Sequence, residues 1–159
     1  MRFAGLIILV VALDQATKAW VTSVFSLYQS REVIPGLFNL IYLTNTGAAF
    51  GILSGHPAWW RHGFFIAIVV VALGVIAYMY RRLRGDSVWY EAALGLIAGG
   101  AIGNLIDRVR FGSVIDFLDF HIGTYHWPAF NVADSAITVG VAIFLVKNLF
   151  FEPGDKKKQ

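Results

Sequence analysis

Residues 88–106 have the sequence VWYEAALGLIAGGAIGNLI, an apolar stretch that matches the roughly 20 residues with which a helix crosses a bilayer. Three further apolar stretches of similar length occupy residues 3–22, 59–80 and 130–151. Of the 159 residues, 57% are hydrophobic and 14% are charged, whereas a soluble domain carries roughly 25% charged residues. The sequence therefore predicts an all-α membrane protein with four transmembrane helices.

The segments between these spans are short. We therefore expect residues 1–159 to form one membrane domain, without a nucleotide-binding unit or a repeat array. The sequence contains no cysteine, which excludes disulfides, thiolate nucleophiles and metal sites with cysteine ligands. The formal net charge of +3 comes mainly from short basic segments beside the spans. Such a distribution bears on membrane orientation, and no nucleic-acid partner is expected.

Basic residues cluster at Arg2, at residues 81–84 and at residues 156–158. Because lysine and arginine accumulate on the cytoplasmic side of a membrane, both termini are predicted to be cytoplasmic. Two segments of the opposite side, residues 37–44 and 113–120, are rich in β-branched and aromatic residues. This composition predicts a few short strands against the outer membrane surface.

Three spans carry small or polar residues at helical spacing. An unpaired ionisable side chain in lipid is costly, so these faces are expected to turn toward protein. The third span runs outward and the fourth runs inward, so their polar positions converge near the outer ends of both helices. The converging positions are Asn104, Asp107, Asn131 and Asp134, which Asp14 and Lys18 approach from further inside the first span. The full set at helical spacing is Asp14, Thr17 and Lys18 in the first span, Gly100, Gly103, Asn104 and Asp107 in the third, and Asn131, Asp134, Ser135 and Thr138 in the fourth.

Five aspartates in or near the spans indicate which chemical reaction the protein could carry out. Asp14, Asp107 and Asp134 lie in or beside spans, and Asp116 and Asp119 lie in the adjoining outer segment. Two neighbouring carboxyls hold one proton between them, so one activates water while the other protonates or polarises a carbonyl. That is the chemistry of an aspartic peptidase. From spacing alone, the partner of Asp134 remains open among Asp107, Asp116 and Asp119.

Other classes of function remain open at this point. A proton-coupled carrier also uses intramembrane acids, although the sequence shows no internal repeat, and a structural subunit would use polar stripes only to join helices. A zinc peptidase is disfavoured because no H-E-x-x-H motif is present. A pair of Ser135 and Lys18 is disfavoured because Asp14 offers Lys18 a charged partner. His121 and His126 are expected to be solvated loop residues.

Several of these positions also have a structural interpretation. Asp14 and Lys18, at i and i+4, are expected to neutralise each other. The consecutive G-x-x-x-G steps that begin at Gly95 predict a close helix-packing surface. For Arg108 two roles are open, since its side chain is long enough to reach the membrane interface or to hold substrate carbonyls.

Five sequence blocks, taken together, carry a resemblance to a known family. They are DQATK at residues 14–18, NTGAAF at 45–50, GNLIDR at 103–108, VIDF at 114–117 and FNVADS at 130–135. Their order and spacing resemble those of the lipoprotein signal peptidases, also called signal peptidase II. The resemblance covers nearly the whole chain.

This resemblance implies a four-helix aspartic peptidase of the bacterial inner membrane with a small β-rich cradle on its extracytoplasmic side. It implies that Asp116 and Asp134 are the catalytic pair, which would resolve the ambiguity left by spacing. The family positions that line or support the substrate groove fall on Asp14, Lys18, Asn45, Gly47, Asn104, Asp107, Arg108, Asn131 and Ala133.

The implied substrate is a prolipoprotein that carries a diacylglyceryl group on a cysteine and is cut immediately before that cysteine. Lipid-modified prolipoproteins and membrane phospholipid are the expected partners, and a monomer is expected. Acid–base chemistry by two carboxyls requires neither a metal nor another cofactor.

Overall fold

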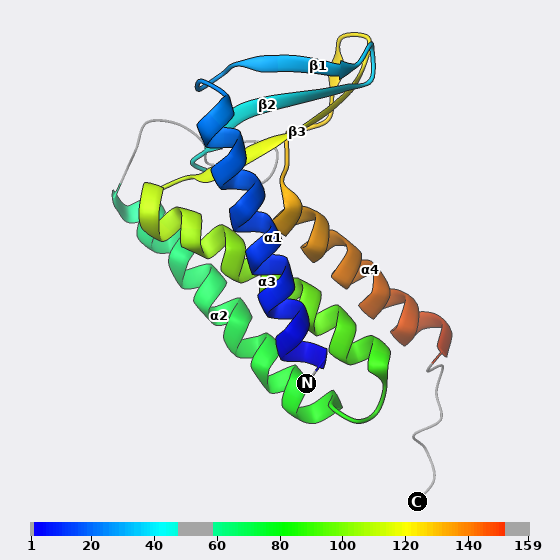
Figure 1. Ribbon diagram of the computed structural model, residues 1–159. Helices are drawn as coiled ribbons and strands as arrows, with labels where there is room; N and C mark the ends of the chain where they lie inside the picture. Colours follow the sequence, from blue (N-terminus) through cyan, green and yellow to red (C-terminus); the bar gives the residue numbers. More distant parts are fainter. Residues whose placement is uncertain (1, 48–58, 152–159) are drawn as a thin grey trace, which may run out of the picture.

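The computed structural model describes residues 2–47 and 59–151. Its long helices are α1 (Arg2–Val24), α2 (Trp59–Leu83), α3 (Val88–Phe111) and α4 (Val132–Phe151). Each contains a segment long and apolar enough to cross a membrane. A small antiparallel sheet lies beyond one end of the helices (Figure 1). The predicted fold class, four membrane helices with a small β-rich cradle, is confirmed.

α3 is longer than its apolar run predicts. It continues past Ile106 to Phe111, because a left-handed Gly112 with φ of 73° ends the helix there and donates its N–H to the Arg108 carbonyl at 3.0 Å. α1 and α2 also extend beyond the predicted spans, since polar and basic residues continue both helices. Asp107 therefore lies inside α3 rather than just after it.

α4 begins later than residue 130, where its apolar run starts. Asn131 is the residue before the helix, and its Oδ1 accepts a hydrogen bond from the Asp134 N–H at 2.9 Å. In return, Asp134 Oδ2 accepts from the Asn131 N–H at 3.3 Å. This reciprocal arrangement is a capping box. It places Asp134 in the first turn of α4, at the end nearest the sheet.

α3 lies at the centre of the bundle and packs against the other three helices (Figure 1). Glycines allow the close approach: a Cβ added at Gly99 would lie 2.8 Å from Val10 Cβ on α1. A Cβ added at Gly100 would overlap the Ala133 carbonyl oxygen on α4. The predicted packing role of the glycine steps is confirmed, and α3 uses glycine against two neighbours.

The sheet has the strand order β1-β2-β3-β4, and all neighbouring pairs are antiparallel. β2 and β3 correspond to the two predicted strand segments. In their register, Leu43 pairs with Asp116 and Asn45 with Val114, after an irregularity that follows Leu40. The strands are β1 (Ser30–Ile34), β2 (Phe38–Asn45), β3 (Val114–Ile122) and β4 (Tyr125–His126).

β3 is fixed to the helices by a small apolar cluster. Phe117 packs against Val21 and Phe25 at the end of α1, and all three are buried. Because successive side chains of a strand point to opposite faces, a Phe117 side chain turned toward α1 turns Asp116 to the other face of the sheet. That face carries the candidate site.

The glycine contacts predict a contrast between two alanine substitutions. Gly100→Ala should destabilise the protein by about 1–3 kcal/mol, because the new methyl group overlaps the backbone of α4. Gly74→Ala on α2 is the control, since no described atom outside its own helix lies within 4 Å of an added Cβ. Thermal unfolding in detergent measures both. Equal unfolding temperatures for the two variants would contradict this account of the packing.

Candidate active site

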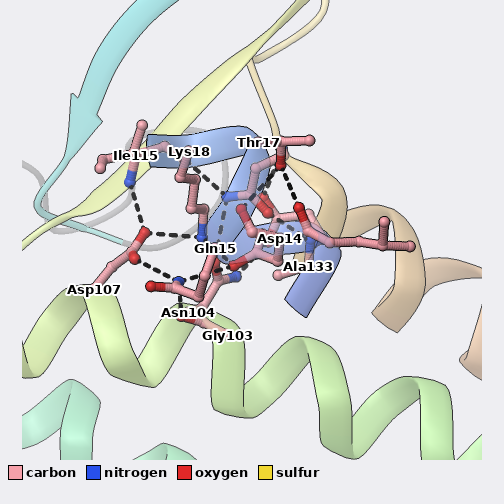
Figure 2. A network of polar contacts seen from close by, with 12 residues as sticks. Asp14, Gln15, Thr17, Lys18, Gly103, Asn104, Asp107, Ile115 and Ala133 are labelled. Atoms are coloured by element: carbon pink, nitrogen blue, oxygen red, sulfur yellow. Dashed lines mark hydrogen bonds and ion pairs between the residues drawn. The ribbon is translucent and has the colours of Figure 1, made fainter. Parts of the chain in front are cut away.

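Lys18 is the centre of a buried ionic network where α1 crosses α3 (Figure 2). Its Nζ lies 2.8 Å from Asp14 Oδ2 and 2.8 Å from Asp107 Oδ2. All three side chains are at most 2% exposed. The predicted pairing of Asp14 with Lys18 is confirmed, but a second carboxylate shares the ammonium group. Buried ions persist only with such close partners, because removing them from water is costly.

Two carboxylates and one ammonium leave an excess negative charge, which neutral donors stabilise. Asp14 Oδ1 accepts from the Ala133 N–H at 3.0 Å, and Asp107 Oδ2 accepts from the Ile115 N–H at 3.1 Å. Gln15 Nε2 lies 2.9 Å from Asp107 Oδ1 and 3.2 Å from Asp14 Oδ2. These bonds join α1 and α3 to the first residues of β3 and α4.

Gln15 is a member of this network that the helical spacing missed. It follows Asp14 directly and so lies about 100° around the helix from it, off the face defined by the i, i+3, i+4 pattern. Its Nε2 also lies 3.2 Å from the Gly103 carbonyl oxygen. The available signal was its amide group, since a polar side chain within an apolar span is expected to turn toward protein.

Asn131 holds the carboxyl groups of Asp116 and Asp134 together. Its Nδ2 donates to Asp116 Oδ1 at 2.8 Å, and its backbone N–H donates to Asp134 Oδ2 at 3.3 Å. The other oxygen of Asp134 accepts from Asn104 Nδ2 at 2.7 Å, while Asn104 Oδ1 accepts from Lys18 Nζ at 3.0 Å. Asn104 therefore connects the ionic network to the carboxyl pair.

The carboxyl group of Asp116 lies outside the membrane helices, on β3, and is buried. Burial, followed by the nearby charge of Asp134, raises the pKa of Asp116 to about 7. Hydrogen bonds from Asn45 Nδ2, at 3.2 Å, and from Asn131 oppose this rise. A carboxyl with a pKa near neutrality is suited to general acid catalysis.

Asp116 and Asp134 line one groove with a volume of about 790 Å³. Its walls come from the end of β2, the start of β3, residues 127–130, and parts of α3 and α4. Much of the lining is apolar and includes Leu43, Phe130 and Ile137. A mainly apolar groove with a few convergent polar groups is the usual form of a binding site.

The other two candidate partners of Asp134 lie elsewhere. Asp107 belongs to the ionic network. Asp119 is an odd number of residues from Asp116 along β3, so the two side chains point to opposite faces of the sheet. The geometry therefore brings Asp116 to Asp134, and brings neither Asp107 nor Asp119.

Arg108 contacts the end of β2 and a ring on α2. Its Nη2 donates to the Gly47 carbonyl at 3.1 Å, and its guanidinium carbon lies 5.2 Å from the centre of the Phe65 ring. The Gly47 N–H in turn donates to Asn45 Oδ1 at 2.9 Å. Arg108 also lines the groove, so its position fits contact with substrate better than contact with the membrane interface.

Two further sequence expectations have an outcome here. Ser135 Oγ donates to the Asn131 carbonyl at 2.9 Å while Lys18 is held by two carboxylates, so the disfavoured serine–lysine pair has no support. The expectation that His121 and His126 are solvated loop residues is wrong as to the loop, because the two lie opposite each other in β3 and β4. The His126 side chain is half exposed, but its Nδ1 lies 2.8 Å from Asp119 Oδ1.

Paired carboxyls in an apolar groove at the end of four membrane helices are the features of an aspartic endopeptidase that acts at a membrane. Residues 6–150 match the family model described as signal peptidase (SPase) II. The chain belongs to this family of bacterial membrane peptidases. The resemblance recognised from the five sequence blocks is thereby confirmed.

Individual relatives agree with this membership. The lipoprotein signal peptidase of Geobacter sulfurreducens is 60% identical over 134 residues, which cover 84% of this chain and 82% of the relative. That of Syntrophus aciditrophicus is 48% identical over 153 residues, with coverages of 96% and 92%. A bacterial membrane enzyme solved by the in meso method at 2.3 Å resolution matches with a TM-score of 0.79 and 34% identity, covering 96% of this chain and 92% of that one.

The ionic network predicts a large effect of removing its cation. Lys18→Met leaves two buried carboxylates without their ammonium partner and should destabilise the protein by about 3–5 kcal/mol. Arg31→Met is the control, because Arg31 lies exposed on β1 and should change stability by less than about 0.5 kcal/mol. Unfolding in detergent measures both. A Lys18→Met protein as stable as the wild type would contradict a structural role for the network.

Proposed function

We propose that this protein removes signal peptides from prolipoproteins with Asp116 and Asp134 as its catalytic pair. The observation that carries the proposal is that both carboxyls line one groove and are held by the same residue, Asn131. Family membership supports a substrate whose cysteine carries a diacylglyceryl group, with cleavage immediately before that cysteine.

In the proposed reaction, Asp116 holds the shared proton at the start, in keeping with its pKa of about 7. Asp134 removes a proton from a water molecule, whose oxygen attacks the scissile carbonyl carbon while Asp116 protonates the carbonyl oxygen. The tetrahedral intermediate then returns this proton to Asp116. The C–N bond of the intermediate breaks, and Asp134 gives its proton to the leaving nitrogen. The steps balance with two carboxyls and water, and they call on neither a metal nor a nucleotide.

The remaining family positions have supporting roles in this proposal. Asn45, Gly47 and Arg108 lie along or beside the groove, where they would hold the peptide backbone. Asn104 and Asn131 orient the two carboxyls. The residues that hold the crossing helices and the start of α4 in place are Asp14, Lys18, Asp107 and Ala133.

The groove also suggests how lipid is accommodated. Val139 lines it, lies in a membrane helix and is 51% exposed. The groove wall therefore continues onto a surface of α4 that would face lipid. We infer that the peptide enters from the side and that its acyl chains stay in the bilayer, next to membrane phospholipid.

For the orientation, we propose cytoplasmic termini and a groove near the extracytoplasmic face of the inner membrane. The start of α1 and the basic turn between α2 and α3 lie at the end of the bundle away from the sheet (Figure 1). Clustered arginines favour the cytoplasmic side. Asp116, Asp134 and the residue that holds both, Asn131, belong to one chain, so the proposed site is complete in a monomer, which is the state we propose.

Asparagine substitutions test the catalytic pair. Asp→Asn keeps the size of the side chain but removes the shared proton and the charge. Asp116→Asn and Asp134→Asn should each lower kcat by about 10³-fold or more while still binding lipidated precursor. The double variant should be scarcely slower than either single one, because the two groups act as a unit. Cleavage is measured by mass spectrometry on purified protein.

The control for this experiment is Glu32→Gln, an acid on β1 whose carboxylate accepts from the Gly36 N–H of its own hairpin. It should cleave at the wild-type rate. An unlipidated precursor tests substrate class and should be cut poorly. Normal cleavage by a well-folded Asp116→Asn protein would show that the pair is wrongly assigned.

The raised pKa of Asp116 predicts the pH dependence of the reaction. The protonated form is the general acid, so kcat/KM should fall as pH rises through about 7, by about tenfold per pH unit once Asp116 is ionised. Asn45→Ala removes a hydrogen bond that lowers this pKa. The variant should therefore raise the pKa further and move the fall in activity to higher pH. A fall that stays in place or moves to lower pH would contradict the assignment of Asp116 as the acid.

A further inference from the structure

A second polar cluster lies on the sheet, on the face away from the proposed catalytic pair. Asp119 of β3 is buried, and its Oδ2 accepts from Asn39 Nδ2 of β2 at 2.9 Å. His126 Nδ1 of β4 lies 2.8 Å from Asp119 Oδ1 and 3.1 Å from Oδ2. Because a carboxylate only accepts, His126 carries a hydrogen on Nδ1. We call these three residues the Asp119 clamp.

The clamp joins three neighbouring strands, of which β4 has the least backbone pairing. This strand has only two residues, which pair with His121 and Ile122 of β3. So short a strand is marginal by its backbone pairing alone. The hydrogen bonds that His126 Nδ1 donates to the charged carboxylate of Asp119 are stronger than neutral ones. They therefore add to the backbone pairing that holds β4 against β3.

The segment that follows β4 forms one wall of the catalytic groove. Residues 127–130, which we call the β4–α4 link, run from the sheet to the start of α4 (Figure 1) and line the groove throughout. Two of its amides are bonded to β3: the Trp127 N–H donates to Phe120 O at 2.8 Å, and the Phe130 N–H donates to Leu118 O at 3.1 Å.

Trp127 directly follows His126 where the chain leaves β4, and it lines the groove. A His126 ring held by Asp119 therefore restricts where Trp127 lies. The His121 ring stacks on His126 with 4.7 Å between ring centres, which further restricts the ring.

We propose that Asp119 is a positioning residue of this peptidase, which through Asn39 and His126 holds the β4–α4 link as a preformed wall for the substrate peptide. It acts on binding and not on the chemical step, because its carboxylate lies on the opposite face of β3 from Asp116. The proposal rests on the proposed function for the identity of the substrate, but the order of the link can be measured without any substrate.

Alanine substitutions at the two ends of the clamp test the proposal. Asp119→Ala and His126→Ala leave the link less ordered, and substrate must then order it on binding. If one molecule in ten keeps the wall formed, KM for lipidated precursor rises about tenfold while kcat stays near the wild-type value. The double variant should be no worse than Asp119→Ala alone, because that substitution already removes the contact that His126→Ala removes.

A conservative variant tests whether the hydrogen bond to Asp119 matters or the His126 ring itself. In His126→Asn the side-chain amide nitrogen replaces Nδ1 as the donor to Asp119, so KM should return most of the way to the wild-type value. Glu32→Ala is the matched control, an acid of the same sheet that bonds within its own hairpin, and it should leave KM unchanged. His126 is half exposed, so its variants keep the test available if Asp119→Ala does not fold.

Hydrogen exchange without substrate gives the second measurement. The amides of Trp127 and Phe130 should exchange faster in Asp119→Ala and His126→Ala than in the wild type or in Glu32→Ala. Unchanged exchange in folded clamp variants, or a fall in kcat at constant KM, would overturn the proposal. Failure of the wild type to cut lipidated precursor would count against the proposed function instead, and the exchange data would still decide the role of the clamp.

Discussion

Lys18 lies between the carboxylates of Asp14 and Asp107, within helices whose side chains are mostly apolar. Ions in such surroundings are tolerated only in fixed contact with partners, so this contact sets the depth at which α1 crosses α3. The crossing is close because α3 has glycine there: a Cβ added at Gly103 would lie 2.6 Å from Asp14 Oδ2. The network also accepts hydrogen bonds from the first residues of β3 and α4. It therefore connects the start of β3 and the start of α4 to the crossing of α1 and α3.

The two carboxyls that we propose as the catalytic pair are positioned from this point by different means. Asp134 is held by a helix end, through the capping box that it forms with Asn131. Asp116 is held by a strand, whose face is set by the packing of Phe117 against α1. Asn131 contacts both carboxyls, because its backbone serves the cap while its side chain reaches the strand. The position of Asn131 between the helix and the sheet thus sets the position of the two carboxyl groups relative to each other.

Much of the fold and part of the site can be predicted from the sequence. What separates the predictable features from the others has a physical cause. Helical spacing predicts that Asn104, Asp107 and Asp134 meet at one level, because in lipid polar side chains must find each other whatever the details of packing. Spacing does not predict which acid accompanies Asp134. The choice depends on which face of β3 each acidic side chain lies on. That face is set by the packing of Phe117 against α1, which is far away in the sequence. The motif match, which carries family information, names Asp116 where periodicity does not.

The contacts that escaped prediction are side-chain bonds between segments far apart in the chain. Gln15 reaches Asp107 on α3, and Asp119 gathers partners from β2 and β4. Neither contact leaves a local pattern, because each requires the tertiary structure before the partners are neighbours. The two differ in consequence. The Gln15 contact belongs to the network that positions the proposed catalytic pair, so a change there is expected to affect the chemical step. The Asp119 contact lies on the other face of the sheet, and in our proposal it affects the groove only through residues 127–130. On this proposal, binding of the peptide and positioning of the two acids depend on separate hydrogen bonds, so one can change while the other is kept.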